Sequence, residues 1–190
     1  MADYTDDFNR ASIGANWTVQ SGTYNTSSSL YLRLHCDSIT GSIYYNASGA
    51  FAGDAYSQVV SASNDSYFGI GPTISCVAGA NTFYFFEVNT GGSALVKVVA
   101  GSASNLATGG AGDASGTGTY RLERVGNTLT AKIGGTTIFT VTDNSSPIAA
   151  GGYAGCGGEG DSSSFLIDSW AGGDIASAAS GKGYNYYSQL

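Results

Sequence analysis

The stretch GTYRLERVGNTLTAKIGGTTIFTVTD (residues 118–143) contains three short runs of strand-forming residues, separated by Gly-Asn and by Gly-Gly. Both dipeptides supply the positive φ angles that tight β-hairpin turns require, so the segment predicts three consecutive antiparallel strands. SLYLRLHC (29–36) gives a related signal, because its leucines alternate with other residues in the period-two pattern of a half-buried strand.

Further strands are predicted in the middle and at the end of the chain. NTFYFFEVNTGGSALVKVVAGS (81–102) indicates two strands around a Gly-Gly turn, and SSSFLIDSWAGGDI (162–175) a last strand. SYFGIGPTISC (66–76) places Phe68, Ile70, Ile74 and Cys76 on one face, with Pro72 indicating a sheet edge or a break. No stretch of ten or more residues shows a capped helical pattern. We therefore predict an all-β, antiparallel two-sheet sandwich.

Length and charge limit the function classes. The chain has 190 residues, enough for one domain with a sizeable core. It carries 7 Lys and Arg against 14 Asp and Glu, a net charge of −7. Such a surface releases few phosphate counterions, which argues against nucleic-acid binding and against anionic membranes. The acidic start MADYTDDFNR does not resemble a signal peptide, so we expect synthesis in a host cytoplasm without processing.

The three cysteines predict free thiols. Cys36, Cys76 and Cys156 are widely spaced, form no Cys-x-x-Cys motif and have a single histidine, His35, to assist them. We expect Cys36 and Cys76 to be buried, because each shares a strand face with apolar residues. Cys156 lies in GGYAGCGGEGDSSS (151–164), which we expect to be a glycine-rich bend, so it is the thiol expected to react most readily.

DDFNRASIGANWTV (6–19) resembles the opening strand and loop of concanavalin A-like lectin and glucanase domains of the laminin-G type. The residues that carry the resemblance follow an Asp-x-Phe-x-Arg start: Phe8, Arg10, Ile13, Gly14 and Trp17. The order of the later strands, ending in FLIDSWAGGDI, fits the same family over residues 5–175. The resemblance implies a jelly-roll sandwich of two curved sheets, with the first and last strands side by side. We expect Trp17 and Trp170 to be buried within it.

The fold hosts both enzymes and binding proteins, so the active-site residues have to be sought separately. A retaining glucanase needs two carboxyl groups about 5 Å apart, which the family supplies from a Glu-x-Asp-x-x-Glu strand. Here Glu87, Glu123 and Glu159 stand alone, and no Gly-x-Ser-x-Gly motif accompanies His35. We predict that the protein is not an enzyme and needs no cofactor or metal, since DSIT, SNDS and DNSS are explained as Asx turns.

A glycan site is a further hypothesis. Tyr31, Arg33 and His35 share the polar face of one predicted strand, and Tyr84 lies on a later one, so the four could form an aromatic platform with polar groups. The alternative is that these tyrosines are ordinary sheet residues, because aromatic side chains have high β-propensity.

The end of the chain differs from the rest. We divide the chain into a sandwich domain (1–175) and a flexible tail (176–190), whose stem ASAASGKG precedes YNYYSQL. Tyrosines offer large contact area at low entropic cost, which suggests that the tail docks on a partner through its apolar side chains: Tyr184, Tyr186, Tyr187 and Leu190.

A small unprocessed jelly roll rich in Gly, Ser, Thr and Tyr resembles accessory virion proteins of tailed bacteriophages. The main hypothesis is therefore a phage structural protein of the capsid, head fibre or tail fibre, located in the virion and bound to other virion proteins and to copies of itself as a homo-oligomer. The alternative is a carbohydrate-binding module that recognises a cell-surface or environmental glycan.

Overall fold

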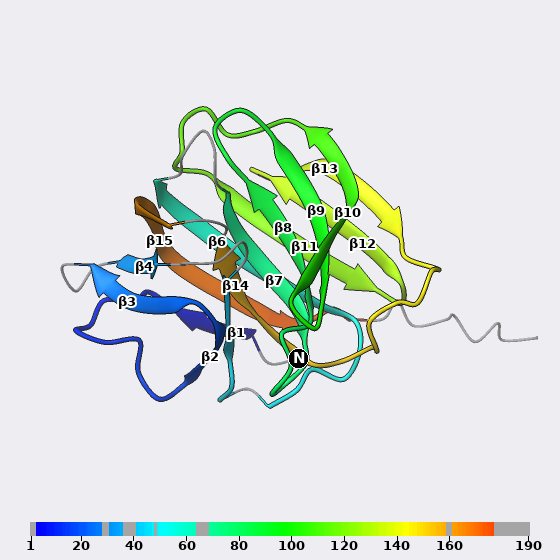
Figure 1. The fold of residues 1–190 in the computed structure, drawn as a ribbon, viewed down its shortest axis with the longest axis horizontal. Helices are drawn as coiled ribbons and strands as arrows, with labels where there is room; N and C mark the ends of the chain where they lie inside the picture. The colour runs from blue at the N-terminus through cyan, green and yellow to red at the C-terminus, as the bar shows by residue number, and fades with distance from the viewer. Residues whose placement is uncertain are drawn as a thin grey trace, which may run out of the picture.

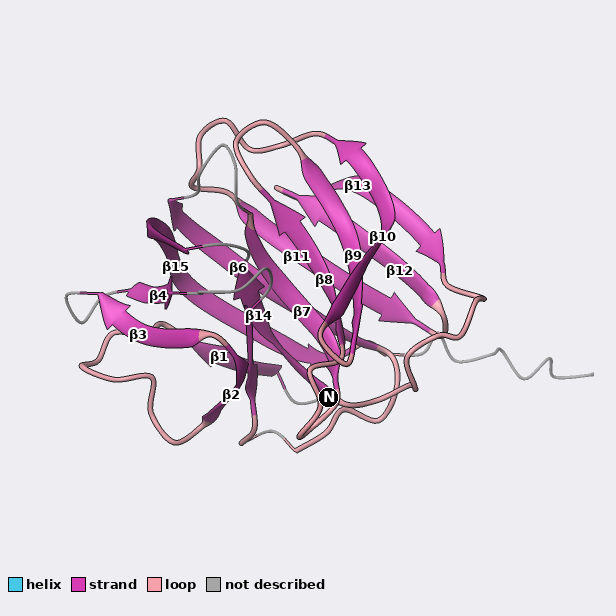
Figure 2. Ribbon diagram, in the orientation of Figure 1, coloured by secondary structure: helices cyan, strands magenta, loops and turns pink. Residues whose placement is uncertain are grey.

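The structure is a computed structural model that describes residues 3–27, 31–35, 41–47, 49–63, 69–158 and 161–176. These residues form strands, turns and loops but no helix, which confirms the all-β prediction (Figure 2). The strands are β1 (Asp3–Asp6), β2 (Trp17–Ser21), β3 (Thr23–Ser27), β4 (Tyr31–His35), β5 (Gly41–Tyr45), β6 (Ala55–Ser63), β7 (Ile70–Cys76), β8 (Phe83–Val88), β9 (Ser93–Val99), β10 (Ser102–Gly110), β11 (Thr119–Val125), β12 (Thr128–Ile133), β13 (Thr136–Thr142), β14 (Tyr153–Gly158) and β15 (Asp161–Asp174).

The strands build two antiparallel sheets that pack as a sandwich (Figure 1). The eight-stranded sheet has the order β13-β12-β11-β6-β15-β4-β3, and β1 pairs with β15 beside this path. The seven-stranded sheet has the order β10-β9-β8-β7-β14-β5-β2. β1 and β15 are the first and last strands, and the pairing of Asp3 with Gly173 and of Asp6 with Trp170 confirms that they lie side by side.

The main core lies between the two sheets. Trp17 is 5% exposed and Trp170 is 2% exposed, which confirms that both tryptophans are buried. Their ring centroids are 5.0 Å apart with the rings edge to face. The indole N–H of Trp170 donates to Ser57 Oγ at 2.9 Å and to the Gly155 carbonyl oxygen at 3.1 Å, so its one polar atom is satisfied inside the core.

Pro72 lies in an interior strand, so the expectation of a sheet edge or break there is wrong. It belongs to β7, between β8 and β14. The β7–β8 ladder pairs Ile70 with Val88 and Thr73 with Phe85 but does not include Pro72, which has no N–H to donate. On the other side Pro72 lies opposite Cys156 of β14. The strand thus accommodates proline at a position where its N–H is not needed.

The expected single apolar face of 66–76 is also corrected. Ile70 and Ile74 pack in the main core, but Cys76 joins a second apolar cluster on the other side of the sheet. Ser75, between Ile74 and Cys76, has a φ of 56°, which interrupts the strand alternation. Cys76 is fully buried as expected. Phe68 and Cys36 lie outside the described residues.

The glycine-rich segment expected to be a bend contains β14, a strand inside the seven-stranded sheet. A Cβ on Gly155 would lie 2.0 Å from the Ile43 carbonyl oxygen, and one on Gly157 would lie 2.4 Å from that of Gly41. Glycine is therefore needed for the close approach of β5 and β14. Cys156 on this strand is fully buried, and burial raises the pKa of its thiol, so the expectation of a reactive Cys156 is wrong.

The outer face of the seven-stranded sheet carries the second apolar cluster: Tyr44, Cys76, Phe83, Phe85, Val96 and Val98. All six residues are buried, and the ring of Tyr44 stacks on that of Tyr153 with centroids 4.5 Å apart. The Gln20 amide of β2 donates to the Val77 carbonyl oxygen at 2.7 Å, so the β7–β8 loop reaches across to the far edge of this sheet. The apolar side chains of this face are therefore covered.

Candidate functional site

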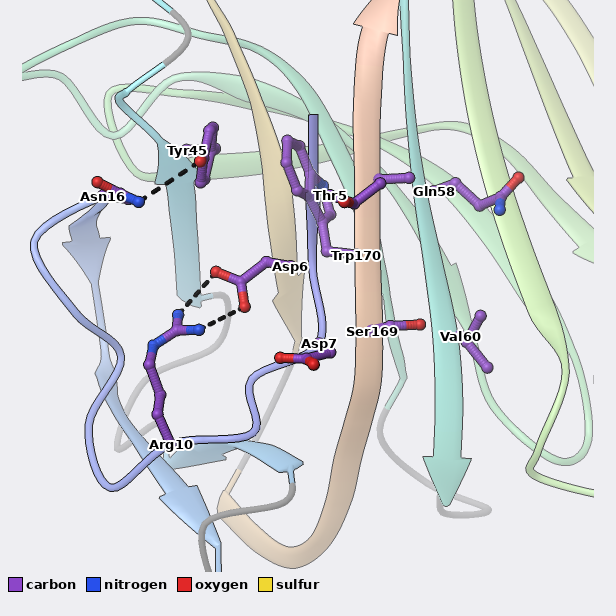
Figure 3. Close-up of a pocket in the computed structure, with 11 residues that line it drawn as sticks. Thr5, Asp6, Asp7, Arg10, Asn16, Tyr45, Gln58, Val60, Ser169 and Trp170 are labelled. Carbon is purple, nitrogen blue, oxygen red and sulfur yellow. Dashed lines mark hydrogen bonds and ion pairs between the residues drawn. The ribbon is translucent and has the colours of Figure 1, made fainter. Parts of the chain in front are cut away.

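A pocket of about 500 Å³ opens on the outer face of the eight-stranded sheet, where β1, β15 and β6 lie next to each other (Figure 3). We call it the outer-face pocket. Its lining residues come from these three strands, from the loop after β1 and from β5: Thr5, Asp6, Asp7, Arg10, Asn16, Tyr45, Gln58, Val60, Ser169, Trp170 and Ala171.

Strand alternation explains which side chains reach the outer-face pocket. On β6, Ser57, Val59 and Ser61 are buried, so Gln58 and Val60 point outward. On β15 the buried Trp170 points into the core, so its neighbours Ser169 and Ala171 point outward. Both neighbours are small, whereas the strands on either side carry larger side chains. The small side chains of β15 therefore form the floor of the pocket, and the larger side chains of the neighbouring strands rise on either side of it.

The register joins these positions into rows across the sheet. Ala171 of β15 pairs with Thr5 of β1 on one side and with Gln58 of β6 on the other. Ser169 pairs with Val60 in the next row. Residues from three separate parts of the sequence thus occupy one small area of rigid sheet, which is the arrangement expected of a preformed binding site.

One wall of the outer-face pocket is held by the carboxylate of Asp6. Arg10 donates to both of its oxygens, at 2.5 Å and 2.7 Å (Figure 3). The Trp17 indole N–H donates to it at 2.7 Å and the Phe8 backbone N–H at 2.8 Å. Burial acts to raise the pKa of Asp6, but the hydrogen bonds from Arg10, Trp17 and Phe8 and the charge of Arg10 outweigh it and lower this pKa. We call this group the Asp6 staple.

The Asp6 staple also fixes the loop that follows β1. Arg10 donates from Nε and Nη2 to the Ile13 carbonyl oxygen, at 3.2 Å and 2.6 Å. Gly14 has a φ of 78°, and a Cβ there would lie 3.2 Å from Arg10 Nε, so the position requires glycine. The residues that resemble the laminin-G opening therefore form a structural staple that shapes one wall of the pocket.

Several polar groups at the outer-face pocket have capacity to bind a ligand. Within the part of the chain that the structure describes, the Gln58 amide and the hydroxyl groups of Thr5 and Ser169 make no hydrogen bond. Asp7 accepts one hydrogen bond at Oδ1, from the Asn9 backbone N–H at 3.0 Å, which leaves Oδ2 available. These groups offer donors and acceptors around an apolar floor.

Two carboxylates near this face, those of Asp6 and Glu123, have lowered pKa values. The Asp6 pKa is lowered as above. Burial acts to raise the pKa of Glu123, but hydrogen bonds from Lys132 at 2.8 Å and Arg121 at 2.6 Å outweigh it and lower this pKa. A glycosidase acid needs the opposite, a raised pKa that keeps its proton near neutral pH. Neither Asp6 nor Glu123 fits that role.

The described residues lack two further features. They contain no group of three or more His, Cys, Asp or Glu side chains placed to hold a metal ion. None of them forms a helix long and apolar enough to cross a membrane.

The residues of the predicted glycan platform are not brought together. Tyr84 is 1% exposed in β8 of the seven-stranded sheet, where its hydroxyl donates to Asp143 Oδ2 at 2.8 Å and accepts from the Ile148 N–H at 2.9 Å. It therefore cannot present its ring to a sugar. Tyr31, Arg33 and His35 lie in β4 of the other sheet, and their side chains lie outside the described residues.

The predicted docking residues Tyr184, Tyr186, Tyr187 and Leu190 also lie outside the described residues. Conversely, the sequence did not single out Thr5, Gln58 or Ser169. The sequence signal near the pocket is the run of small residues after Trp170, which marks a closing strand whose small side chains leave space above the sheet.

Comparisons with known proteins identify the fold. No protein-family model and no curated protein matches the chain. The carbohydrate-binding module CBM66 from Bacillus subtilis matches with a TM-score of 0.57 and 15% identity, over 87% of this chain and 97% of that one. A β-glucanase from Bacillus licheniformis matches with a TM-score of 0.60 and 12% identity, over 93% of this chain and 99% of that one. A protein of unknown function with a galectin-like fold, also from Bacillus subtilis, matches with a TM-score of 0.64 and 12% identity, over 89% of this chain and 94% of that one.

These similarities confirm the jelly-roll sandwich of the concanavalin A-like and galectin-like type. At such low identity they concern the fold alone.

Proposed function

We propose that this chain is a carbohydrate-binding domain that holds a glycan in the outer-face pocket without cleaving it. The observation that carries the proposal is the pocket itself, about 500 Å³ in volume, with hydrogen-bonding groups on three adjacent strands that have no partner among the described residues. Support comes from the fold, which resembles a carbohydrate-binding module and a β-glucanase.

The chemistry of the pocket suits a sugar. A pyranose ring has an apolar face and a rim of hydroxyl groups, each of which both donates and accepts hydrogen bonds. Ala171 and Val60 offer an apolar floor, whereas the Gln58 amide and the Thr5 and Ser169 hydroxyls can donate and accept at its edges. A volume of about 300–1,000 Å³ is usual for small-ligand sites, so the pocket has room for more than one sugar ring.

The carboxylates of the outer-face pocket support binding without catalysis. Asp6, the most buried carboxylate of the outer-face pocket, is committed to the Asp6 staple and has a lowered pKa, so it neither donates a proton nor attacks a sugar. Asp7 is exposed and held in a tight turn by its hydrogen bond from Asn9. A retaining mechanism requires two carboxyl groups about 5 Å apart with opposite roles, and this pair does not offer a general acid.

The test is a glycan array followed by titration calorimetry of the best ligand. Ala171→Tyr places a large side chain on the pocket floor and should lower affinity at least about tenfold, because the ligand loses its contact surface. Thr130→Tyr is the matched control, since Thr130 points outward from the same sheet on β12, away from the pocket. The proposal would be contradicted if Ala171→Tyr bound the ligand as tightly as wild type, if no glycan on the array bound, or if a bound glycan were hydrolysed.

The phage virion hypothesis receives no support from the comparisons, which favour the glycan-binding alternative. A virion location, a homo-oligomer and docking through Tyr184, Tyr186, Tyr187 and Leu190 stay predictions.

A further inference from the structure

We propose that the ligand of the outer-face pocket is an extended, uncharged polysaccharide chain that runs across the strands, from β1 over β15 and β6 to β11, where Arg121 supplies the last subsite. This inference rests on the proposed function, since it concerns the same pocket. It goes further in naming the form and charge of the ligand and in adding a binding residue outside the pocket.

The sheet register places the row of outward side chains that such a chain would follow. Thr5 pairs with Ala171, Ala171 with Gln58, and Gln58 with Arg121 of β11. Arg121 lies between the buried residues Tyr120 and Leu122, so it points outward as Gln58 does. Neighbouring strands are about 4.8 Å apart, close to the length of one pyranose unit in an extended chain, so successive sugars would meet successive strands.

Arg121 is held in place by its contacts with Tyr56 and Glu123. Its guanidinium group lies over the ring of Tyr56 at 3.7 Å from the centroid, and its Nε–H donates to Glu123 Oε1 at 2.6 Å. The Tyr56 hydroxyl is also hydrogen-bonded to this guanidinium group, whose other N–H groups face no second carboxylate among the described residues. A guanidinium group fixed in this way loses little conformational entropy on binding, so its hydrogen bonds to sugar hydroxyls would contribute with little ordering cost.

Gln58 connects the outer-face pocket to Arg121. Figure 3 shows the Gln58 amide on the side of β6 that faces away from Ser169 and β15. That side is occupied by β11, since β6 lies between β15 and β11 in the sheet. A ligand that contacts both Ser169 and the Gln58 amide therefore has to pass over β6. A shorter ligand that bound only beside Asp6 would not contact the Gln58 amide.

The charges on this face argue for an uncharged ligand. Arg10 is paired with Asp6, and Arg121 and Lys132 share Glu123. Asp7 forms no ion pair of its own among the described residues, since Arg10, whose charge also acts on Asp7, is paired with Asp6, and the chain carries a net charge of −7. A polyanionic polysaccharide would bring a carboxylate beside Asp7, where the cation that acts on Asp7, Arg10, is already paired with Asp6, and this costs binding free energy.

Titration calorimetry with cello-, xylo-, manno- and laminari-oligosaccharides of two to six units tests this inference. For the series that binds, affinity should rise up to about four units, one for each strand crossed, and then level off. Arg121→Leu keeps an apolar cover on Tyr56 but removes the donors, so it should weaken the tetramer and hexamer about tenfold and leave the dimer unchanged. Lys132→Leu is the matched control, because it removes the other cation from Glu123 and should bind as wild type.

The outcomes separate this inference from the proposed function. Equal affinity for dimer and hexamer, an equal effect of both variants, or tighter binding of polygalacturonate than of the neutral series would overturn the extended-chain inference while leaving glycan binding intact. If no oligosaccharide binds and no glycan on the array binds, both the extended-chain inference and the proposed glycan binding are overturned. If Arg121→Leu does not fold, Arg121→Lys serves instead, since it keeps the charge but loses the planar set of donors and should show the same dependence on chain length.

Discussion

Replacing Asp143 by alanine should strongly destabilise the protein, because it leaves a charged lysine inside without its partner. The Asp143 side chain is 3% exposed and that of Lys97 is 9% exposed, with Nζ and Oδ2 2.7 Å apart. Tyr84 donates to the same oxygen at 2.8 Å, and Lys97 also donates to the carbonyl oxygens of Ser145 and Ser146. The pair ties the loop after β13 to β8 and β9.

The size of the effect follows from the burial. Removing one partner of a buried ion pair costs about 3–5 kcal/mol, whereas replacing both partners with apolar residues costs far less. In a protein of this length each kcal/mol lowers the melting temperature by about 2–4 °C, so Asp143→Ala should melt roughly 6–20 °C below wild type. The double variant Lys97→Met with Asp143→Leu should recover most of that loss, since no unpaired charge remains.

The pH dependence has a definite sign. Burial acts to raise the pKa of Asp143, but hydrogen bonds from Lys97 and Tyr84 and the charge of Lys97 outweigh it, so the folded-state pKa lies below the ordinary 3.8. The stabilisation is therefore fully present above that ordinary pKa and is lost as the pH falls through the lower folded-state value. Urea denaturation at neutral pH and near pH 3 should show the gap between wild type and Asp143→Ala narrowing in acid. A single-variant loss below about 1 kcal/mol, or a gap that widens in acid, would refute the buried-pair argument.

Three further predictions concern the core. Trp170→Ala should cost about 3–5 kcal/mol in urea denaturation, because it removes a ring packed against Trp17 and leaves Ser57 without its donor; a loss below about 1 kcal/mol would contradict the core assignment. Gly155→Ala should abolish soluble expression or lower the melting temperature sharply, since its Cβ would overlap the backbone of β5, and wild-type stability would disprove the close approach. Cys76, whose pKa burial raises to about 12, and Cys156 should resist iodoacetamide in the native state, as measured by mass spectrometry; rapid labelling of either would show that it is accessible.

Strands that are joined by short turns could be predicted from the sequence alone. The three strands β11, β12 and β13 follow from two short glycine turns, and Gly126, Gly134 and Gly135 all have the positive φ that those turns require. The side-by-side placement of β1 and β15 came from the family resemblance, not from any local signal.

Strands whose stability depends on their neighbours were harder to predict. β14 has three glycines among its six residues, a composition with low β-propensity, and it is a strand because β5 and β7 pair with it on both sides. Tyr84 was misplaced for a related reason. The run FYFF is apolar at every position because both faces of β8 are buried, so alternation could not show which side chains point outward.

The outer-face pocket could not be predicted because its residues are ordinary polar side chains far apart in the sequence. Thr5, Gln58 and Ser169 meet only through the β1–β15 and β6–β15 registers, and a shift of one residue in either would turn them into the core. The nearby motif was recognisable, but the structure assigns Asp6, Phe8 and Arg10 to shaping the wall.

The position of β15 has a consequence for how the chain is made. This strand lies between β6 and β4, yet it comes last. Until residues 161–174 leave the ribosome, the eight-stranded sheet therefore consists of three separate pieces (β13-β12-β11-β6, β4-β3 and β1), with open edges on β6 and β4. At about 5–20 residues per second that interval lasts several seconds after β6 is synthesised. During it the exposed edges are available for pairing with other chains. Addition of β15 completes the sheet and covers the edges of β6 and β4.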